Sequence, residues 1–311
     1  MINTGVWQKE LAPVTSFKLG LIADEASQDL DEAAALAHSY GATGLEIRSV
    51  YGKQLTELTD EDLSNIKKTL KKHKMVCCGI SSPFFKCQPE EADEHLKLLD
   101  CYIRIAKELG TDRIRGFAFW KKPERPFSEV LPIIKEKLTE AALKLRTAGM
   151  TLLLENEPST YDTDAAAIVE IIKAVDMPEI QGLWDPGNDI YTATREIPYP
   201  NGYELLRPWI GHFHIKDARR NEEDRPISVR FGDGIVDYVG QFERLSSEGY
   251  TGWLVLEPHY RSKALTEEQL MNPGGMAFSS GGMRATAECF EALLRFFDEH
   301  GYTVKDEVIG N

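Results

Sequence analysis

Four residues that could bind a divalent cation recur at long intervals from the middle of the 311-residue chain onward. They are Glu155 in "LLLENEP", Asp185 in "LWDPGN", His214 in "HFHIKDA" and Glu257 in "WLVLEPHY", which stand 30, 29 and 43 residues apart. Three carboxylates that converge without a cation would repel one another and could not all stay ionised. An oxygen-rich set with one imidazole favours a single Mn²⁺ or Mg²⁺, with Zn²⁺ or Co²⁺ as alternatives.

Each of these residues lies at the end of an apolar run that is typical of a β-strand. Eight such runs occur, at residues 17–23, 43–49, 75–81, 113–119, 150–156, 180–186, 211–217 and 252–258. Helical patterns separate them, and three of these end at a glycine, at Gly41, Gly110 and Gly149. The alternation predicts parallel strands with crossover helices, and eight units predict an α/β protein with a (β/α)₈ barrel. A doubly wound sheet fits less well, because no GxGxxG follows the first strand.

The chain reads as one domain, since no Pro/Ser-rich linker divides it. We expect an N-terminal extension over 1–16, the barrel over 17–300 and a C-terminal tail over 301–311. In a barrel of this kind the carboxyl ends of all strands meet at one mouth. The four candidate ligands should therefore converge there, and the long connections at 218–251 and 259–282 should cover the mouth.

The amino-acid composition of the chain restricts the classes of partner that it can bind. The net charge is −14, so a phosphate backbone would be repelled and nucleic acid is not expected. No apolar stretch approaches the roughly 20 residues of a membrane span. The N-terminus has no signal-peptide pattern, and the five cysteines form no CxxC spacing, which favours a cytoplasmic protein with reduced thiols. A homo-oligomer is compatible with a barrel of this size, although the sequence indicates no interface.

Each candidate ligand also has a purely structural interpretation. A glutamate at a strand end often caps a helix, Asp185 before Pro-Gly can form a turn, and a histidine between apolar residues is usually a satisfied core residue. Taken singly, these interpretations are the stronger ones. Four coincidences at matching positions of consecutive strands are harder to accept than one metal site.

Several neighbours could contact a substrate. Lys216 follows His214 by two residues, so on a strand it points the same way. Asn188 and His259 lie just after their ligands and could bind sugar hydroxyls. Arg230, beside "FGDG", is a candidate contact for a hydroxyl or a phosphate, and equally a solvated loop residue.

Other candidates also have structural alternatives, and for Trp120 the structural alternative is the favoured one. Arg48 could contact substrate or pair with Glu46 on the same strand, and Trp120 could contact substrate or be a core aromatic. Two residues are expected to support the ligands, namely Asn156 and Asp217, of which Asp217 would orient His214.

The motifs "LLLENEP", "LWDPGN", "HFHIKDA", "GDGIVDY" and "WLVLEPHY", in this order, resemble the xylose-isomerase-like TIM barrel superfamily and its sugar phosphate isomerase/epimerase branch in particular. The stretches "LGLIADE" and "GLEIRSVYGK" are similar to that branch as well. The resemblance extends from about residue 17 to 300. It implies a metal on Glu155, Asp185, His214 and Glu257.

The resemblance also implies a reaction. In the isomerases and epimerases of this group the metal chelates two adjacent oxygens of an open-chain ketose and stabilises the enediolate. Glu155 and Glu257 would then be the acid/base pair of an isomerase or epimerase that acts on a sugar or a sugar-like polyol ketone. A dehydratase or lyase acting on a keto-sugar or an inosose could use the same site.

Two further functions are weaker alternatives. A metal-dependent AP endonuclease of this superfamily binds three metals through additional histidines, but here Asn188 stands where that branch has a histidine and "ISSPFF" has none. A barrel that only binds a ligand, or that is one subunit of a larger lyase, also remains open.

Overall fold

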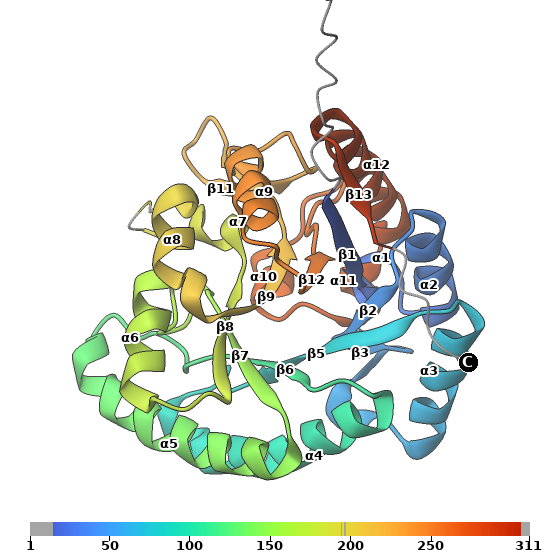
Figure 1. Ribbon diagram of the computed structural model, residues 1–311. Helices are drawn as coiled ribbons and strands as arrows, with labels where there is room; N and C mark the ends of the chain where they lie inside the picture. Colours follow the sequence, from blue (N-terminus) through green and yellow to red (C-terminus); the bar gives the residue numbers. More distant parts are fainter. Residues whose placement is uncertain (1–14, 194, 196, 306–311) are drawn as a thin grey trace, which may run out of the picture.

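The computed structural model describes residues 15–193, 195 and 197–305. Its centre is a closed barrel of eight parallel strands, formed by β1 (Thr15–Ile22), β2 (Gly44–Ile47), β5 (Val76–Phe84), β6 (Arg113–Gly116), β7 (Thr151–Glu155), β8 (Ile180–Trp184), β9 (Ile210–Ile215) and β12 (Trp253–Leu256). The last strand closes the barrel by pairing with the first, with Lys18 opposite Trp253. The predicted (β/α)₈ architecture is confirmed (Figure 1).

Helices surround the strands as an outer ring (Figure 1). The long ones are α2 (Leu30–Ser39), α3 (Asp60–Lys72), α4 (Ala92–Leu109), α5 (Phe127–Ala148), α6 (Ala165–Val175), α9 (Tyr238–Ser247) and α12 (Gly282–His300). As predicted, α4 and α5 end at glycines, because Gly110 and Gly149 take left-handed conformations with φ of 76° and 71°. None of the helices found in the described residues is both long and apolar enough to cross a membrane.

Short elements fill the connections. They are α1 (Ala23–Ala26), β3 (Ser49–Val50), β4 (Lys53–Gln54), η1 (Leu55–Glu57), η2 (Pro89–Glu91), α7 (Pro186–Asp189), η3 (Pro198–Gly202), α8 (Tyr203–Leu206), η4 (Arg207–Trp209), β10 (Asp217–Arg220), β11 (Pro226–Val229), α10 (Glu267–Met271) and α11 (Gly275–Ser279). The hairpin β10–β11 and the segment α10–α11 belong to the two long connections. Both contribute residues to a cavity above the strand ends, as the sequence predicts.

The termini differ in part from the expected domain limits. Residues 1–14 of the predicted extension lie outside the described residues, whereas Thr15 and Ser16 already belong to β1. The predicted tail begins with β13 (Tyr302–Val304), which pairs in parallel with β1. This part of the tail therefore extends the sheet, and residues 306–311 lie outside the described residues.

Side chains along each strand point alternately toward the surrounding helices, where the main core lies, and toward the inside of the barrel, where the candidate site lies. On β12, Leu254 and Leu256 belong to the main core between strands and helices, whereas Trp253 and Val255 belong to a small separate cluster. Side chains on a strand alternate between two faces, so Glu257 continues the inward row of Trp253 and Val255. The same alternation sets the buried polar residues Glu46, Arg48, Arg115, Glu155, His212 and His214 on the inner side of their strands.

Candidate metal centre

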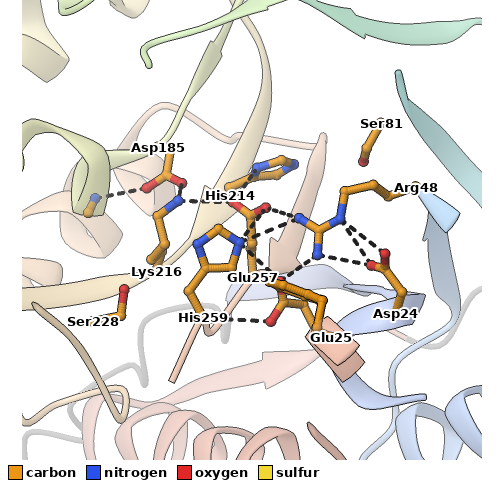
Figure 2. Close-up of polar contacts among 12 residues, drawn as sticks. Asp24, Glu25, Arg48, Ser81, Asp185, His214, Lys216, Ser228, Glu257 and His259 are labelled. Atoms are coloured by element: carbon orange, nitrogen blue, oxygen red, sulfur yellow. Dashed lines mark hydrogen bonds and ion pairs between the residues drawn. The ribbon is translucent and has the colours of Figure 1, made fainter. Parts of the chain in front are cut away.

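The structure brings the four candidate ligands together at the mouth of the barrel. Glu155 is the last residue of β7, Asp185 follows β8, His214 lies on β9 and Glu257 follows β12. Each offers one donor atom, and these atoms all lie within 4.8 Å of one another. All four side chains are buried, and Figure 2 shows Asp185, His214 and Glu257 side by side.

The donor set fits a divalent cation. His214 Nδ1 lies 3.4 Å from Glu155 Oε1 and 3.3 Å from Glu257 Oε2. This nitrogen is buried and has no hydrogen-bond partner among the described residues. Ligands about 2.1 Å from an octahedral cation stand about 3 Å from one another. One imidazole nitrogen between two carboxylate oxygens therefore has the spacing and the chemistry of a metal site.

Buried cations contact the same carboxylates. Lys216 Nζ lies 2.6 Å from Asp185 Oδ2 and 3.1 Å from Glu257 Oε2. Arg48 Nη1 lies 2.7 Å from Glu257 Oε1 (Figure 2). A third cation, Arg115, places Nη1 3.0 Å from an oxygen of the β7 ligand. These contacts offset part of the repulsion within the cluster.

The carboxylates do not share one electrostatic environment. Burial raises the pKa of Asp185 to about 7, although Lys216 opposes the shift. Burial is also the largest single influence on Glu155 and disfavours its charged form, but Arg115 and His214 together outweigh it and lower the pKa to about 2. Asp185 is thus the carboxylate that most needs another positive charge in order to stay ionised at neutral pH.

Glu46 lies beneath His214 and was not predicted to contact it. Its carboxylate accepts from His212 Nε2 at 2.8 Å, lies 3.3 Å from His214 Nε2 and accepts the hydroxyl of Ser81. A carboxylate at Nε2 favours the tautomer that leaves Nδ1 free to bind a cation. An ion pair between Glu46 and Arg48, one of the two alternatives that the sequence left open, does not form.

Arg48 instead links residues that follow the first strand of the barrel, β1, to a residue that follows the last, β12. Its guanidinium contacts Asp24 at 2.9 Å and Glu25 at 2.7 Å, both in the short helix α1 that follows β1, in addition to Glu257 after β12. Ser49, the next residue, also donates to Asp24. Arg48 therefore spans the seam at which the barrel closes.

The two residues expected to support the ligands have different positions. Asn156 bonds to both backbone groups of Asp185, with its Nδ2 2.7 Å from the carbonyl and its Oδ1 2.8 Å from the amide nitrogen. Asp217, by contrast, accepts from the amides of Gly232 and Gly234 at 2.9 and 3.0 Å, and a Cβ at Gly234 would collide with its carboxylate. The contacts of Asp217 thus hold the loop after β11, and the structure does not bring Asp217 to His214.

A cavity of about 520 Å³ lies above the candidate ligands. Of the predicted substrate contacts, Lys216, Asn188 and His259 line it. Asn188 Nδ2 donates to Glu155 at 3.3 Å, and His259 Nε2 lies 3.4 Å from Glu257. We call this space the metal-side cavity.

The remaining predicted contacts lie elsewhere. Arg48 lines a neighbouring cavity of about 390 Å³, which we call the second cavity. Trp120 forms a backbone bridge with Thr160 and lines a shallow hollow beside the metal-side cavity. Arg230 pairs with Asp233 at 2.9 Å in a half-exposed loop and lines neither cavity. The structure does not bring Trp120 or Arg230 into the site.

Some residues of the site were missed by the sequence reasoning. Lys86 and Glu157 form an ion pair of 3.0 Å in the wall of the metal-side cavity. Asp24 and Glu25 anchor Arg48. The signal was available for three of them, because Glu157 in "LLLENEP" and Asp24 and Glu25 in "LGLIADE" stand just past strand ends, as Glu155 stands at one.

Comparisons with known proteins agree with this architecture. An inosose dehydratase from Lacticaseibacillus casei is 23% identical over 128 residues, which cover 37% of this chain and 42% of that enzyme. The chain thus spans less than half of the length of this curated relative. A D-psicose 3-epimerase from Clostridium cellulolyticum H10, solved with D-tagatose, superposes with a TM-score of 0.71 at 16% identity, over 92% of this chain and 100% of that one.

A second solved structure has the same fold. It is a xylose isomerase-like TIM barrel protein from Mycobacterium smegmatis in complex with magnesium, with a TM-score of 0.62 at 18% identity over 90% of this chain and 98% of that one. The family model of the xylose isomerase-like TIM barrel matches residues 34–279, which is most of the chain. This protein therefore belongs to the xylose isomerase-like TIM barrel family.

Proposed function

We propose that the protein is a divalent-metal-dependent enzyme that moves a proton at a carbon next to a carbonyl in a sugar or a sugar-like polyol. The observation that carries this proposal is the arrangement of Glu155 and Glu257 around His214 Nδ1, at 3.4 and 3.3 Å, below an open cavity. The names of the relatives, an epimerase and a dehydratase, are consistent with such chemistry.

Glu155 and Glu257 are the proposed acid and base. They come from β7 and β12, on either side of β9, so each can face a different side of one substrate carbon. Removal of a proton by one carboxylate and return by the other inverts that carbon, which is an epimerisation. Removal and return by the same carboxylate on one face gives a 1,2-isomerisation. When bound, Mn²⁺ or Mg²⁺ would supply Lewis acidity at the carbonyl and stabilise the enediolate charge.

Lys216 and Asn188 are the proposed positioning groups for substrate oxygens. Lys216 has three donors, and its contacts with Asp185 and Glu257 hold its ammonium at the floor of the cavity. Asn188 donates one amide hydrogen to Glu155 and keeps a second for a hydroxyl. Both groups would fix the carbon acid within reach of the carboxylates.

A dehydratase is the second candidate, favoured by the match to inosose dehydratases. The same proton removal would be followed by loss of a β-hydroxyl, which needs a proton donor. His259 lines the cavity next to Glu257 and is the proposed donor. The endonuclease alternative is less favoured, because the net charge is −14 and Asn188 replaces a histidine of that branch.

The direct test is uptake of deuterium. Purified protein loaded with Mn²⁺ is incubated in D₂O with ketoses, inososes and keto-glycosides, and the products are analysed by NMR. We expect deuterium at one carbon next to the ketone of the true substrate, with epimerisation, isomerisation or elimination read from the product. A panel that shows neither exchange nor turnover with metal-loaded protein would contradict the proposal.

Glu46 is the proposed positioning residue for the imidazole of His214. Replacing Glu46 by glutamine keeps the size but removes the charge that favours a proton on Nε2. We expect the affinity for Mn²⁺ to fall by about 10- to 100-fold, in line with the loss of such outer partners in other metal sites. Isothermal titration calorimetry with Mn²⁺ measures this affinity directly. The control is Ser81→Ala, which leaves both histidine contacts of Glu46 in place and should lower the affinity less. An unchanged affinity in Glu46→Gln would refute the role.

A further inference from the structure

The metal-side cavity and the second cavity share one boundary. Their volumes are about 520 and 390 Å³, and both are lined by Lys86, Arg115, Met271 and Pro273. Each volume falls within the range of about 300–1,000 Å³ that small-molecule sites occupy. The two hollows therefore lie next to each other under the same covering segment, and a ligand in one could reach the other across this boundary.

The second cavity differs chemically from the first. It contains none of the four candidate ligands, and its walls combine apolar side chains such as Leu55 and Leu98 with uncharged polar ones such as Gln54 and Thr56. His95 also lines it, and accepts the amide of Phe85 at Nδ1 over 2.9 Å. Its Nε2 then carries the hydrogen and can donate to a ligand.

An anionic ligand is not favoured there, because the cations that reach the second cavity already have partners. Arg48 contacts Asp24 at 2.9 Å, and Arg115 and Lys86 are each 3.0 Å from a glutamate, Glu155 and Glu157 respectively. Apolar walls with neutral donors and acceptors suit an uncharged ring that has hydroxyl or ether oxygens at its edge.

Among the residues that the structure describes, the segment that covers the boundary is anchored to the barrel only at its ends. Arg261 contacts Glu25 at 3.3 Å before it, and the amide of Gly275 donates to Ser49 at 2.9 Å after it. Between these anchors, the hydrogen bonds of α10 stay inside the covering segment, as in Gln269 Nε2 to the carbonyl of Ala277 at 3.0 Å. In the described residues, no hydrogen bond or ion pair fixes α10 to the barrel, so Met271 and Pro273 can yield to a ligand beneath them.

On the side of the boundary opposite the covering segment, the side chain of Lys86 is held by several contacts. The ammonium of Lys86 lies 3.0 Å from Glu157, 4.9 Å from the ring centre of Phe117 and 5.2 Å from that of Trp120. Its ion pair uses one of three donors, so two remain for an oxygen that crosses from one cavity to the other.

From these features we propose that the second cavity is a subsite for a second ring, and that the substrate is a glycoside whose reacting sugar lies over the candidate metal centre. The second ring, either a sugar or an aromatic aglycone, lies against Leu55 and Leu98, and the glycosidic oxygen passes Lys86. This inference deepens the proposed function and rests on it for the identity of the reacting ring.

The test uses ligands that lack a ketone, so that binding is measured without turnover. Dissociation constants of methyl glucoside, phenyl glucoside and cellobiose are determined by NMR titration of the Mg²⁺-loaded protein. We expect at least one two-ring ligand to bind about tenfold or more tightly than methyl glucoside. If only phenyl glucoside binds more tightly than methyl glucoside, the second ring is an aromatic aglycone. If cellobiose binds more tightly, the second ring is a sugar.

A variant that fills the second cavity tests whether the tighter binding of a two-ring ligand arises there. Leu98 is 36% exposed on α4, so Leu98→Trp can fill the second cavity without disturbing the core. We expect this variant to lose the gain for the two-ring ligand while its affinities for methyl glucoside and Mg²⁺ stay unchanged. Leu143→Trp, at an exposed position of α5 that lines neither cavity, is the matched control and should behave as the parent protein.

Two results would overturn the subsite. One is equal affinity for one-ring and two-ring ligands in the parent protein, and the other is a gain that persists in Leu98→Trp. Neither result depends on proton exchange, so a failed subsite is distinguishable from a failed reaction assignment. Deuterium uptake by a keto-monosaccharide, together with equal affinities, would keep the proposed function and remove the subsite.

Discussion

Replacing Glu155 by glutamine is expected to lower turnover by about 10²- to 10⁴-fold, the usual contribution of a positioned acid or base. The amide keeps an oxygen for the cation but cannot accept the proton of the substrate. Glu257→Gln should have an effect of the same size. Both variants are assayed for deuterium uptake with each epimer of the substrate, and Mn²⁺ affinity is measured in parallel so that loss of the metal is not mistaken for loss of the base.

The pattern across the two epimers is the informative part. If each carboxylate serves one face, Glu155→Gln should lose exchange with one epimer and Glu257→Gln with the other. If one carboxylate serves both steps, a single variant should lose exchange with both. The matched control is Glu179→Gln, whose side chain pairs with Arg146 at 2.7 Å and lines neither cavity. Retention of full exchange in both site variants would disprove the acid/base assignment.

Removal of the metal should abolish activity but leave the protein folded. Lys216, Arg48 and Arg115 each lie within about 3 Å of a candidate ligand and offset part of the carboxylate repulsion. A cation at 100 times its dissociation constant stabilises the folded state by about 2.7 kcal/mol. For a chain of 311 residues that corresponds to a fall of roughly 4 °C in the unfolding midpoint on chelation.

Calorimetry and circular dichroism measure this effect. The midpoint should rise again when Mn²⁺ or Mg²⁺ is added back, together with activity. In Asp185→Asn and His214→Ala the difference between metal-loaded and chelated samples should shrink or vanish, since each removes one donor. Equal midpoints with and without metal, together with no binding in equilibrium dialysis, would count against a metal centre at this position.

Much of this architecture follows from periodicity. The eight apolar runs are the eight barrel strands, because strands of a parallel barrel are buried on both faces and read as continuous apolar segments. The convergence of Glu155, Asp185, His214 and Glu257 follows from a common strand direction. The β13 strand was not predicted, because three residues after a glycine carry too little pattern to be distinguished from a tail.

The partners of the site could be predicted only in part. The two-residue period places Glu46 and Arg48 on the inner face, but it does not say which inward residue on another strand each will meet. Arg48 finds Asp24 and Glu25 on a neighbouring strand end, and Glu46 finds His212 and His214 across the barrel. Such pairings depend on strand stagger, which the sequence does not display. Arg230 and Trp120 line neither cavity, and the sequence could not indicate this, since loop residues lack a period that fixes their direction.

The pairing of β12 with β1 has a consequence for the order in which the molecule becomes functional. The proposed ligand set draws on β7, β8, β9 and the residue after β12, and Arg48 reaches that residue only across the closing seam. A nascent chain is synthesised from its N-terminus, so any ribosome-bound intermediate that ends before Glu257 lacks the final carboxylate. Cation binding by the complete proposed ligand set would therefore have to follow the synthesis of Glu257 and the pairing of β12 with β1.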